Sequence, residues 1–170
     1  MVHMKNLRFS CNFVLYKASV SLIAIFLLLG CATPYQKSHA FAFHMYHDNQ
    51  DTEVLDYWYG KNASHAMVAE SEWRKEKGIP KQGESIFGLT KRGDYLYVKW
   101  RNLTSKIIYE DLVDLRYRLP DDLAMSTIYF MVKNEQLMIY IVSDTSKGAD
   151  EPSIGPRLYR DRKVKLIYPN

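Results

Sequence analysis

Four residues near the start of the chain, His39, His44, His47 and Asp48, carry side chains that can bind a transition metal. Imidazole nitrogens and carboxylate oxygens are ordinary zinc ligands, so the group would suit a metal centre if the backbone held it rigidly. Their spacing matches no ordinary zinc motif, and the surrounding segment has no hydrophobic period. We therefore expect a solvated, histidine-bearing linker here, with no metal site and no cofactor.

Hydrolytic chemistry finds little support in the remaining polar residues. His65 is the one histidine further along the chain, and no serine lies in a nucleophile-elbow motif. The adjacent acids Glu110 and Asp111 fit the solvent face of a strand, and the adjacent acids Asp121 and Asp122 fit a turn. The glycines of residues 78–83 lack the Gly-Lys-Ser/Thr of a phosphate loop. These patterns predict a protein that is not an enzyme.

One cysteine does lie in a context with defined chemistry. Three basic residues and no acidic ones precede position 31, and residues 18–29 form an apolar run of signal-peptide length, too short to span a bilayer comfortably. The run ends in Leu28-Leu29-Gly30-Cys31, which resembles the lipobox of bacterial lipoproteins. The resemblance implies cleavage before Cys31 and lipid attachment to that cysteine. Ala32 follows, where Asp would be the usual signal for inner-membrane retention, so the expected location is the outer membrane, facing the periplasm.

Cleavage would change what the composition implies. The mature chain would have 140 residues with 20 Lys and Arg against 19 Asp and Glu, because the leader carries three basic residues and no acid. The alkaline isoelectric point is then largely a property of the leader, which removes the main argument for nucleic-acid binding. Cys11 would leave with the leader and Cys31 would carry lipid, so no disulfide, cysteine metal site or cysteine nucleophile is expected.

The elements that must position any site are mostly strands. We expect a signal peptide over residues 1–30, a lipidated N-terminus and flexible tether over 31–50, and a single β-rich domain over 51–170. Strands are predicted at residues 54–60, 95–100, 106–118 (with a bulge or bend at Asp111), 127–133, 136–143 and 163–168, and one short helix near 64–77. Residues 127–143 read as a hairpin with a tight turn at Asn134 and Glu135. The pattern predicts a mainly β fold, an antiparallel β-sandwich or open barrel of about six to eight strands.

Aromatic residues are the one feature that stands above background. The chain has thirteen tyrosines and three tryptophans, and some, such as Tyr95 and Tyr97, alternate onto a strand face expected to be exposed. Trp73 lies beside Arg74 and Lys75 on the predicted helix. Aromatic residues and arginine are enriched at protein–protein interfaces, so we predict partner binding at these five positions. Packing on the second face of a sandwich is the alternative explanation for most of the tyrosines.

The strand segments also carry a family resemblance. Residues 92–100, 109–116 and the Leu119-Pro120 pair, together with 55–60 and 162–169, resemble small proteobacterial lipoproteins found beside type VI secretion effectors, notably lipases. The resemblance implies an immunity protein that binds and neutralises a toxic effector of the phospholipase or lipase type. Two alternatives stay open: a structural or assembly lipoprotein that binds another envelope protein, and a hydrolytic lipoprotein.

Overall fold

The computed structural model describes residues 39–88 and 91–169. The signal peptide and Cys31 lie outside the described residues, as does the part of the expected tether before His39. The described elements are β1 (Ala40–His44), α2 (Met45–Asp48), β2 (Thr52–Gly60), η1 (Ala63–His65), β3 (Ala66–Ala69), α3 (Glu72–Lys77), β4 (Gly83–Ile86), β5 (Tyr95–Asn102), β6 (Ile108–Asp114), β7 (Ser126–Lys133), β8 (Gln136–Ser146), η2 (Arg157–Tyr159) and β9 (Arg162–Tyr168).

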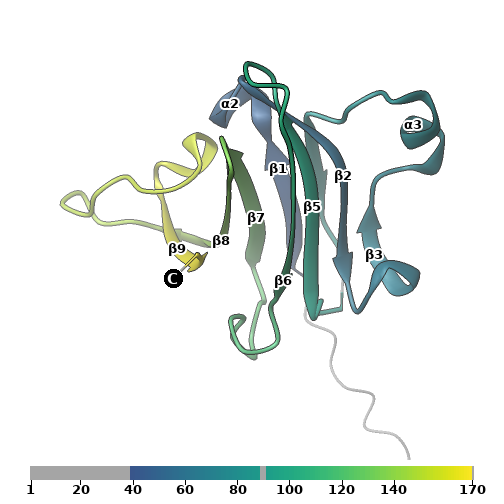
Figure 1. The fold of residues 1–170 in the computed structure, drawn as a ribbon. Coiled ribbons are helices and arrows are strands. Elements are labelled where there is room, and N and C mark those ends of the chain that lie inside the picture. Colours follow the sequence, from purple (N-terminus) through teal and green to yellow (C-terminus); the bar gives the residue numbers. More distant parts are fainter. Residues whose placement is uncertain (1–38, 89–90, 170) are drawn as a thin grey trace, which may run out of the picture. The chain divides into compact units, whose positions relative to one another are not determined.

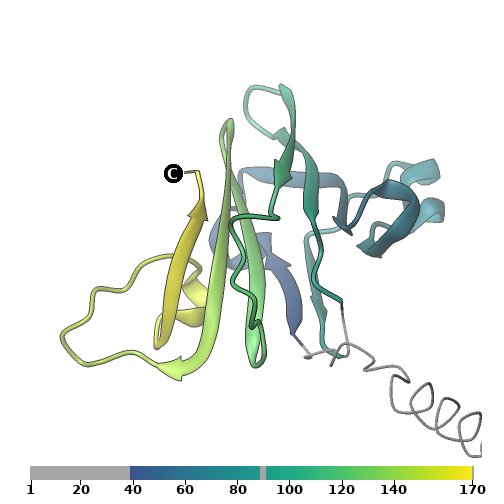
Figure 2. The same ribbon diagram turned by 90° about the horizontal axis from the view of Figure 1, so that it is seen from below.

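These strands form two sheets, and the predicted mainly β fold is confirmed as a β-sandwich. The five-stranded sheet has the order β4-β1-β7-β8-β9, and the four-stranded sheet has the order β3-β2-β5-β6. The two sheets lie side by side as layers, with β9 at one side of the domain and β3 with α3 at the other (Figures 1 and 2). β1 pairs with β7 in parallel, so the five-stranded sheet is mixed rather than wholly antiparallel as expected.

The core lies between the layers and is rich in aromatic rings. Phe43 of β1 stacks on Phe130 of β7 with ring centroids 4.5 Å apart, and its edge meets Tyr57 of β2 at 4.9 Å. Trp100 of β5 is 1% exposed and donates its indole N–H to the Asn134 carbonyl oxygen at 2.8 Å, which ties the four-stranded sheet to the β7–β8 turn. Burial of apolar surface of this kind is the main stabilising term of a domain without disulfides.

The expected tether over residues 31–50 is wrong from His39 onward. Phe41 and Phe43 are at most 1% exposed, and β1 lies inside the five-stranded sheet between β4 and β7. His39 is not solvated either, because it is 3% exposed and its Nε2 lies 3.0 Å from the Tyr59 hydroxyl oxygen. The segment belongs to the core because its small and aromatic residues fill both faces of a short central strand.

Two other local expectations also fail. The helix expected near residues 64–77 is shorter, and η1 and β3 precede α3 within that range. The bulge expected at Asp111 is absent from the pairing of β5 with β6, where Val98 and Asp111 are partners in an unbroken register. Asp111 fits the inward side of β6 because its carboxylate accepts a hydrogen bond from the Tyr168 hydroxyl at 2.6 Å.

Candidate functional site

The outward face of the four-stranded sheet displays a row of apolar and aromatic side chains. Trp58, Tyr97 and Leu112 are direct cross-strand partners on β2, β5 and β6. The Trp58 and Tyr97 rings stack with centroids 6.0 Å apart and planes 20° apart, and Leu112 is 56% exposed. Cross-strand aromatic pairs stabilise a sheet while keeping a flat ring surface open to solvent. We define Trp58, Tyr97 and Leu112 as the aromatic row.

Charged residues form the adjacent row of the same face. Asp56, Lys99 and Glu110 are cross-strand partners, one step along the strands from the aromatic row. The Tyr97 hydroxyl donates to Glu110 Oε2 at 3.0 Å, and Lys99 Nζ lies 3.8 Å from the same oxygen. Burial and then the hydrogen bond to Glu110 raise the pKa of Tyr97, so its hydroxyl stays a donor at neutral pH. The phenol is thereby held in one orientation on the sheet.

Tyr95 lies at the other side of the aromatic row, next to Arg116. The Arg116 guanidinium is 5.3 Å from the centroid of the Tyr95 ring. It also donates three hydrogen bonds to the Asp114 carboxylate, the shortest at 2.6 Å. Its hydrogen bonds to Arg116 hold the pKa of Asp114 below the usual range. Rings therefore occupy two neighbouring rows of the face, at Tyr95 and Tyr97, and charged side chains lie on both sides of them.

Helix α3 borders this face and carries the other three predicted residues. Lys75 Nζ lies 3.0 Å from Asp56 Oδ1; burial lowers the pKa of Lys75, but the hydrogen bond and charge of Asp56 outweigh that effect and raise it. The Arg74 guanidinium lies 3.0 Å from Glu70 and donates to the Pro80 carbonyl at 2.7 Å, so this residue holds the α3 segment in place. Trp73 is 54% exposed and stays open to a partner.

The opposite outer face of the sandwich is covered by the chain's own loop. Tyr129 and Tyr140 of the five-stranded sheet are buried there, and the Tyr159 ring of η2 meets Tyr129 edge-on at 5.4 Å. Asp48 fastens this cover, accepting the Tyr129 hydroxyl at 2.6 Å and the Arg157 backbone N–H at 2.8 Å. The covering loop, residues 147–161, lies beside β7, β8 and β9 in Figure 1. On the face that carries the aromatic row, the α3 segment packs beside Lys99, and Trp58 and Tyr97 stay partly exposed.

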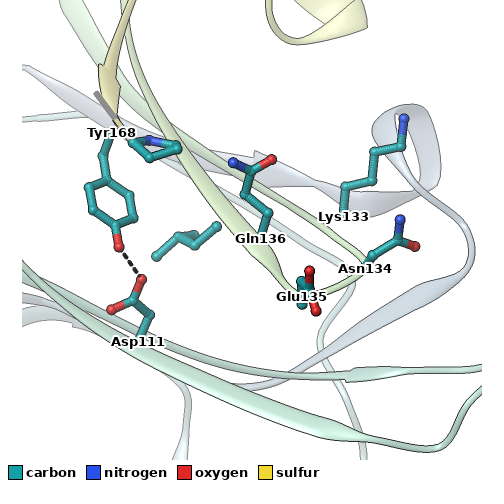
Figure 3. A pocket seen from close by; sticks show the side chains of 8 residues that line it. Asp111, Lys133, Asn134, Glu135, Gln136 and Tyr168 are labelled. Carbon is teal, nitrogen blue, oxygen red and sulfur yellow. Dashed lines mark hydrogen bonds between the residues drawn. The ribbon is translucent and has the colours of Figure 1, made fainter.

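A polar pocket of about 580 Å³ opens at the edge of the sandwich between β6 and the β7–β8 turn. Figure 3 shows Asp111 and Tyr168 on one side of it and Lys133, Asn134, Glu135 and Gln136 on the other. The hydrogen bond to Asp111, with burial as the second cause, raises the pKa of Tyr168. Glu110 points to the opposite face of β6, so the two adjacent acids do not act as a pair, and the solvent-face interpretation is wrong for Asp111.

Of the histidines and acids considered for chemistry, His44, His47 and Asp48 lie near one another, and the others lie elsewhere. The His44 and His47 ring centroids are 6.1 Å apart. The His65 ring of η1 is hydrogen-bonded to Asn62, the residue before that helix. Asp121, in the β6–β7 connection, forms an ion pair with Arg92, which lies before β5. In residues 39–88 and 91–169, no three His, Cys, Asp or Glu side chains are arranged to hold a metal ion. The pocket brings one hydroxyl and one carboxylate together, those of Tyr168 and Asp111. The outward sheet face joins rings and charges from three strands, and we take that face as the candidate site.

Of the residues on this face, the sequence pattern predicts Tyr95 and Tyr97 as candidates but not Trp58 and Leu112. Both lie on the same face as Tyr97, and only the register of the three strands shows that they form one row. The alternation of residues 95–100 was the signal for the face, and no signal in a single strand reveals its neighbours.

Comparisons of the chain with protein-family models, with curated proteins and with solved structures find no match. Within the part of the chain that the structure describes, no helix is long and apolar enough to cross a membrane.

Proposed function

We propose that this protein is a lipid-anchored immunity protein, which binds a toxic lipase-like effector through the outward face of the four-stranded sheet and neutralises it. The observation that carries the proposal is the partly exposed aromatic row with its flanking charges, set against an opposite face that the chain covers with its own loop. The resemblance to lipoproteins associated with type VI effectors supports the choice of partner.

The chemistry of the face suits protein recognition. Rings of Trp and Tyr bury a large area at a low cost in conformational entropy, and they dominate the energetically important positions of interfaces. The charges of Lys99 and Glu110 beside the rings would select a partner with complementary charges and reject others. An inhibitor needs such a rigid surface and needs no catalytic group.

Anchoring places the inhibitor where a lipase would act. The proposed lipid on Cys31 would confine the domain to the periplasmic side of the outer membrane, and confinement raises the effective concentration of an inhibitor towards a membrane-active enzyme.

The test uses bacteria that produce a candidate lipase-like effector in the periplasm. Survival is measured with the wild-type protein, with Tyr97→Ala, and with Tyr46→Ala, a matched change at an exposed tyrosine of α2 that is 68% exposed and outside the sheet face. We expect protection by the wild type and by Tyr46→Ala, and lower survival with Tyr97→Ala at equal protein levels. Killing despite normal levels of the wild-type protein would reject immunity and favour a structural role in the envelope.

A further inference from the structure

The chain enters the sandwich at one defined end. β1 begins at Ala40, and the preceding residue, His39, is buried against the Tyr59 hydroxyl, which also accepts the Gly93 backbone N–H at 2.8 Å. His39 is eight positions after Cys31. Eight residues reach at most about 29 Å when fully extended, and an eight-residue strand is itself about 26 Å long. The end where β1 begins is therefore held within about one strand length of the lipidated cysteine.

Loops at this same end display large apolar side chains. β4 runs antiparallel to β1 and ends there, where Phe87 follows it with 73% of its surface exposed. β7 runs parallel to β1 and begins there, preceded by Met125 at 68% exposure. Tyr117, at 91% exposure, lies in the connection from β6 to β7, which is seen at the lower end of the sheets in Figure 1.

Charge at this end is largely paired within the loops. Arg116 is bonded to Asp114, and Arg92 lies 3.3 Å from Asp121 and donates to the Arg116 and Pro120 carbonyls. A contact made here would therefore depend mainly on apolar and aromatic groups, with the exposed Lys91 as an added cation. Tyrosine and phenylalanine at loop tips suit the headgroup region of a bilayer, where a ring can lie in the apolar layer and a hydroxyl can stay hydrated.

We propose that Phe87, Tyr117 and Met125 form a second membrane contact that docks this end of the sandwich on the bilayer and holds the sheets away from it. The inference rests on the proposed lipid anchor at Cys31, since the anchor brings these loops within reach. Docking in this orientation leaves the aromatic row of the outward face, and the far ends of β5 and β6, open to a partner in the periplasm.

The experiment uses the acylated mature protein, reconstituted in vesicles of phosphatidylethanolamine with a minor share of phosphatidylglycerol. The mature chain has no cysteine besides Cys31, so Lys91→Cys and Ser105→Cys each provide a single thiol for an environment-sensitive fluorophore. Lys91 is exposed at the proposed contact end, and Ser105 is exposed in the β5–β6 turn at the other end. A third protein combines Lys91→Cys with Phe87→Ser and Tyr117→Ser.

We expect the probe at position 91 to shift to shorter wavelength and to be quenched by nitroxide-labelled lipids, at low and at high salt, while the probe at position 105 does neither. The shift should be lost when Phe87 and Tyr117 are both serine, with an unchanged circular dichroism spectrum. Equal emission from positions 91 and 105, a shift that persists in the double serine variant, or one that appears only on addition of the effector would overturn the inference. Absence of acyl chains on Cys31 would reject the anchor and this contact together, whereas binding of the effector in solution would be unaffected.

Discussion

Replacement of Phe43 by alanine tests whether residues 39–50 belong to the folded core. Phe43 is 0% exposed and lies between the rings of Phe130 at 4.5 Å and Tyr57 at 4.9 Å. Loss of a buried phenylalanine ring costs about 3–5 kcal/mol, and the cost is highest where the surroundings cannot close the cavity. Phe130 and Tyr57 are fixed in strands of opposite sheets, so we expect about 4 kcal/mol here.

The assay is urea unfolding of the unacylated mature chain, with Cys31 replaced by serine. At a slope of about 1.5 kcal/mol per molar urea, a loss of about 4 kcal/mol lowers the unfolding midpoint by roughly 2.7 M. Tyr46→Ala, two residues beyond β1 and 68% exposed, is the matched control and should change the free energy of unfolding by no more than about 0.5 kcal/mol. If Phe43→Ala and Tyr46→Ala were equally mild, residues 39–50 would be a tether and the placement of β1 would be wrong.

Three further outcomes follow from the packing and the titrating groups. Gly93→Ala should destabilise by more than about 1 kcal/mol, because a Cβ there would lie 2.5 Å from the Tyr59 ring; thermal unfolding followed by circular dichroism measures the loss. Burial raises the pKa of Tyr59 to about 12, above the value of about 10 in the unfolded chain. The contribution of the neutral phenol to the free energy of unfolding is therefore complete below about pH 10 and is lost as the pH rises towards about 12. The urea midpoint should be lower at about pH 11 than at about pH 8, and the difference should be smaller in Tyr59→Phe. Tyr168→Phe should cost about 1 kcal/mol, because the hydroxyl loses its bond to Asp111, and an unchanged urea midpoint would contradict that bond.

The strongly alternating strands could be predicted from sequence. β5 lies where residues 95–100 alternate between side chains expected to be buried and side chains expected to be exposed. Leu96, Val98 and Trp100 are buried as expected. The β7–β8 hairpin turns at Asn134, which has a φ of 55°, a conformation that Asn tolerates better than most residues. β5 carries its own signal because one of its faces is buried and the other is wetter, whereas the hairpin is marked by its turn residue between two β-rich runs.

The missed strands lack that local signal. β1 is five residues long and both of its faces are buried, so Ala40, Phe41, Ala42 and Phe43 show no alternation of polarity. β3 and β4 are four residues each and form edges, where pairing with a neighbour decides the structure rather than intrinsic preference. The parallel pairing of β1 with β7 joins segments 87 residues apart (Ala40 with Thr127), which no local pattern encodes.

The residues of the candidate site also fall into those that one strand's sequence predicts and those that only the folded structure reveals. Tyr95 and Tyr97 follow from the alternation of one strand, whereas Trp58 and Leu112 join them only through cross-strand register. Arg74 looked like a surface anchor because it neighbours Trp73, but its guanidinium meets a glutamate and a carbonyl that the α3 turn brings to it. Side chains within a few positions of each other can have unlike roles when the backbone between them turns.

The most direct test of the proposed binding face is the affinity of the purified effector for the wild-type protein and for the variant with both Trp58 and Tyr97 replaced by alanine. Interface anchors of this kind are each worth about 2 kcal/mol, so the two together are worth about 4 kcal/mol. We expect the dissociation constant of the double variant to rise roughly 700-fold, at an unchanged slope of urea unfolding. Tyr46→Ala should bind as the wild type does. Equal affinity of the wild type and the double variant would contradict the claim that the outward face of the four-stranded sheet binds the effector.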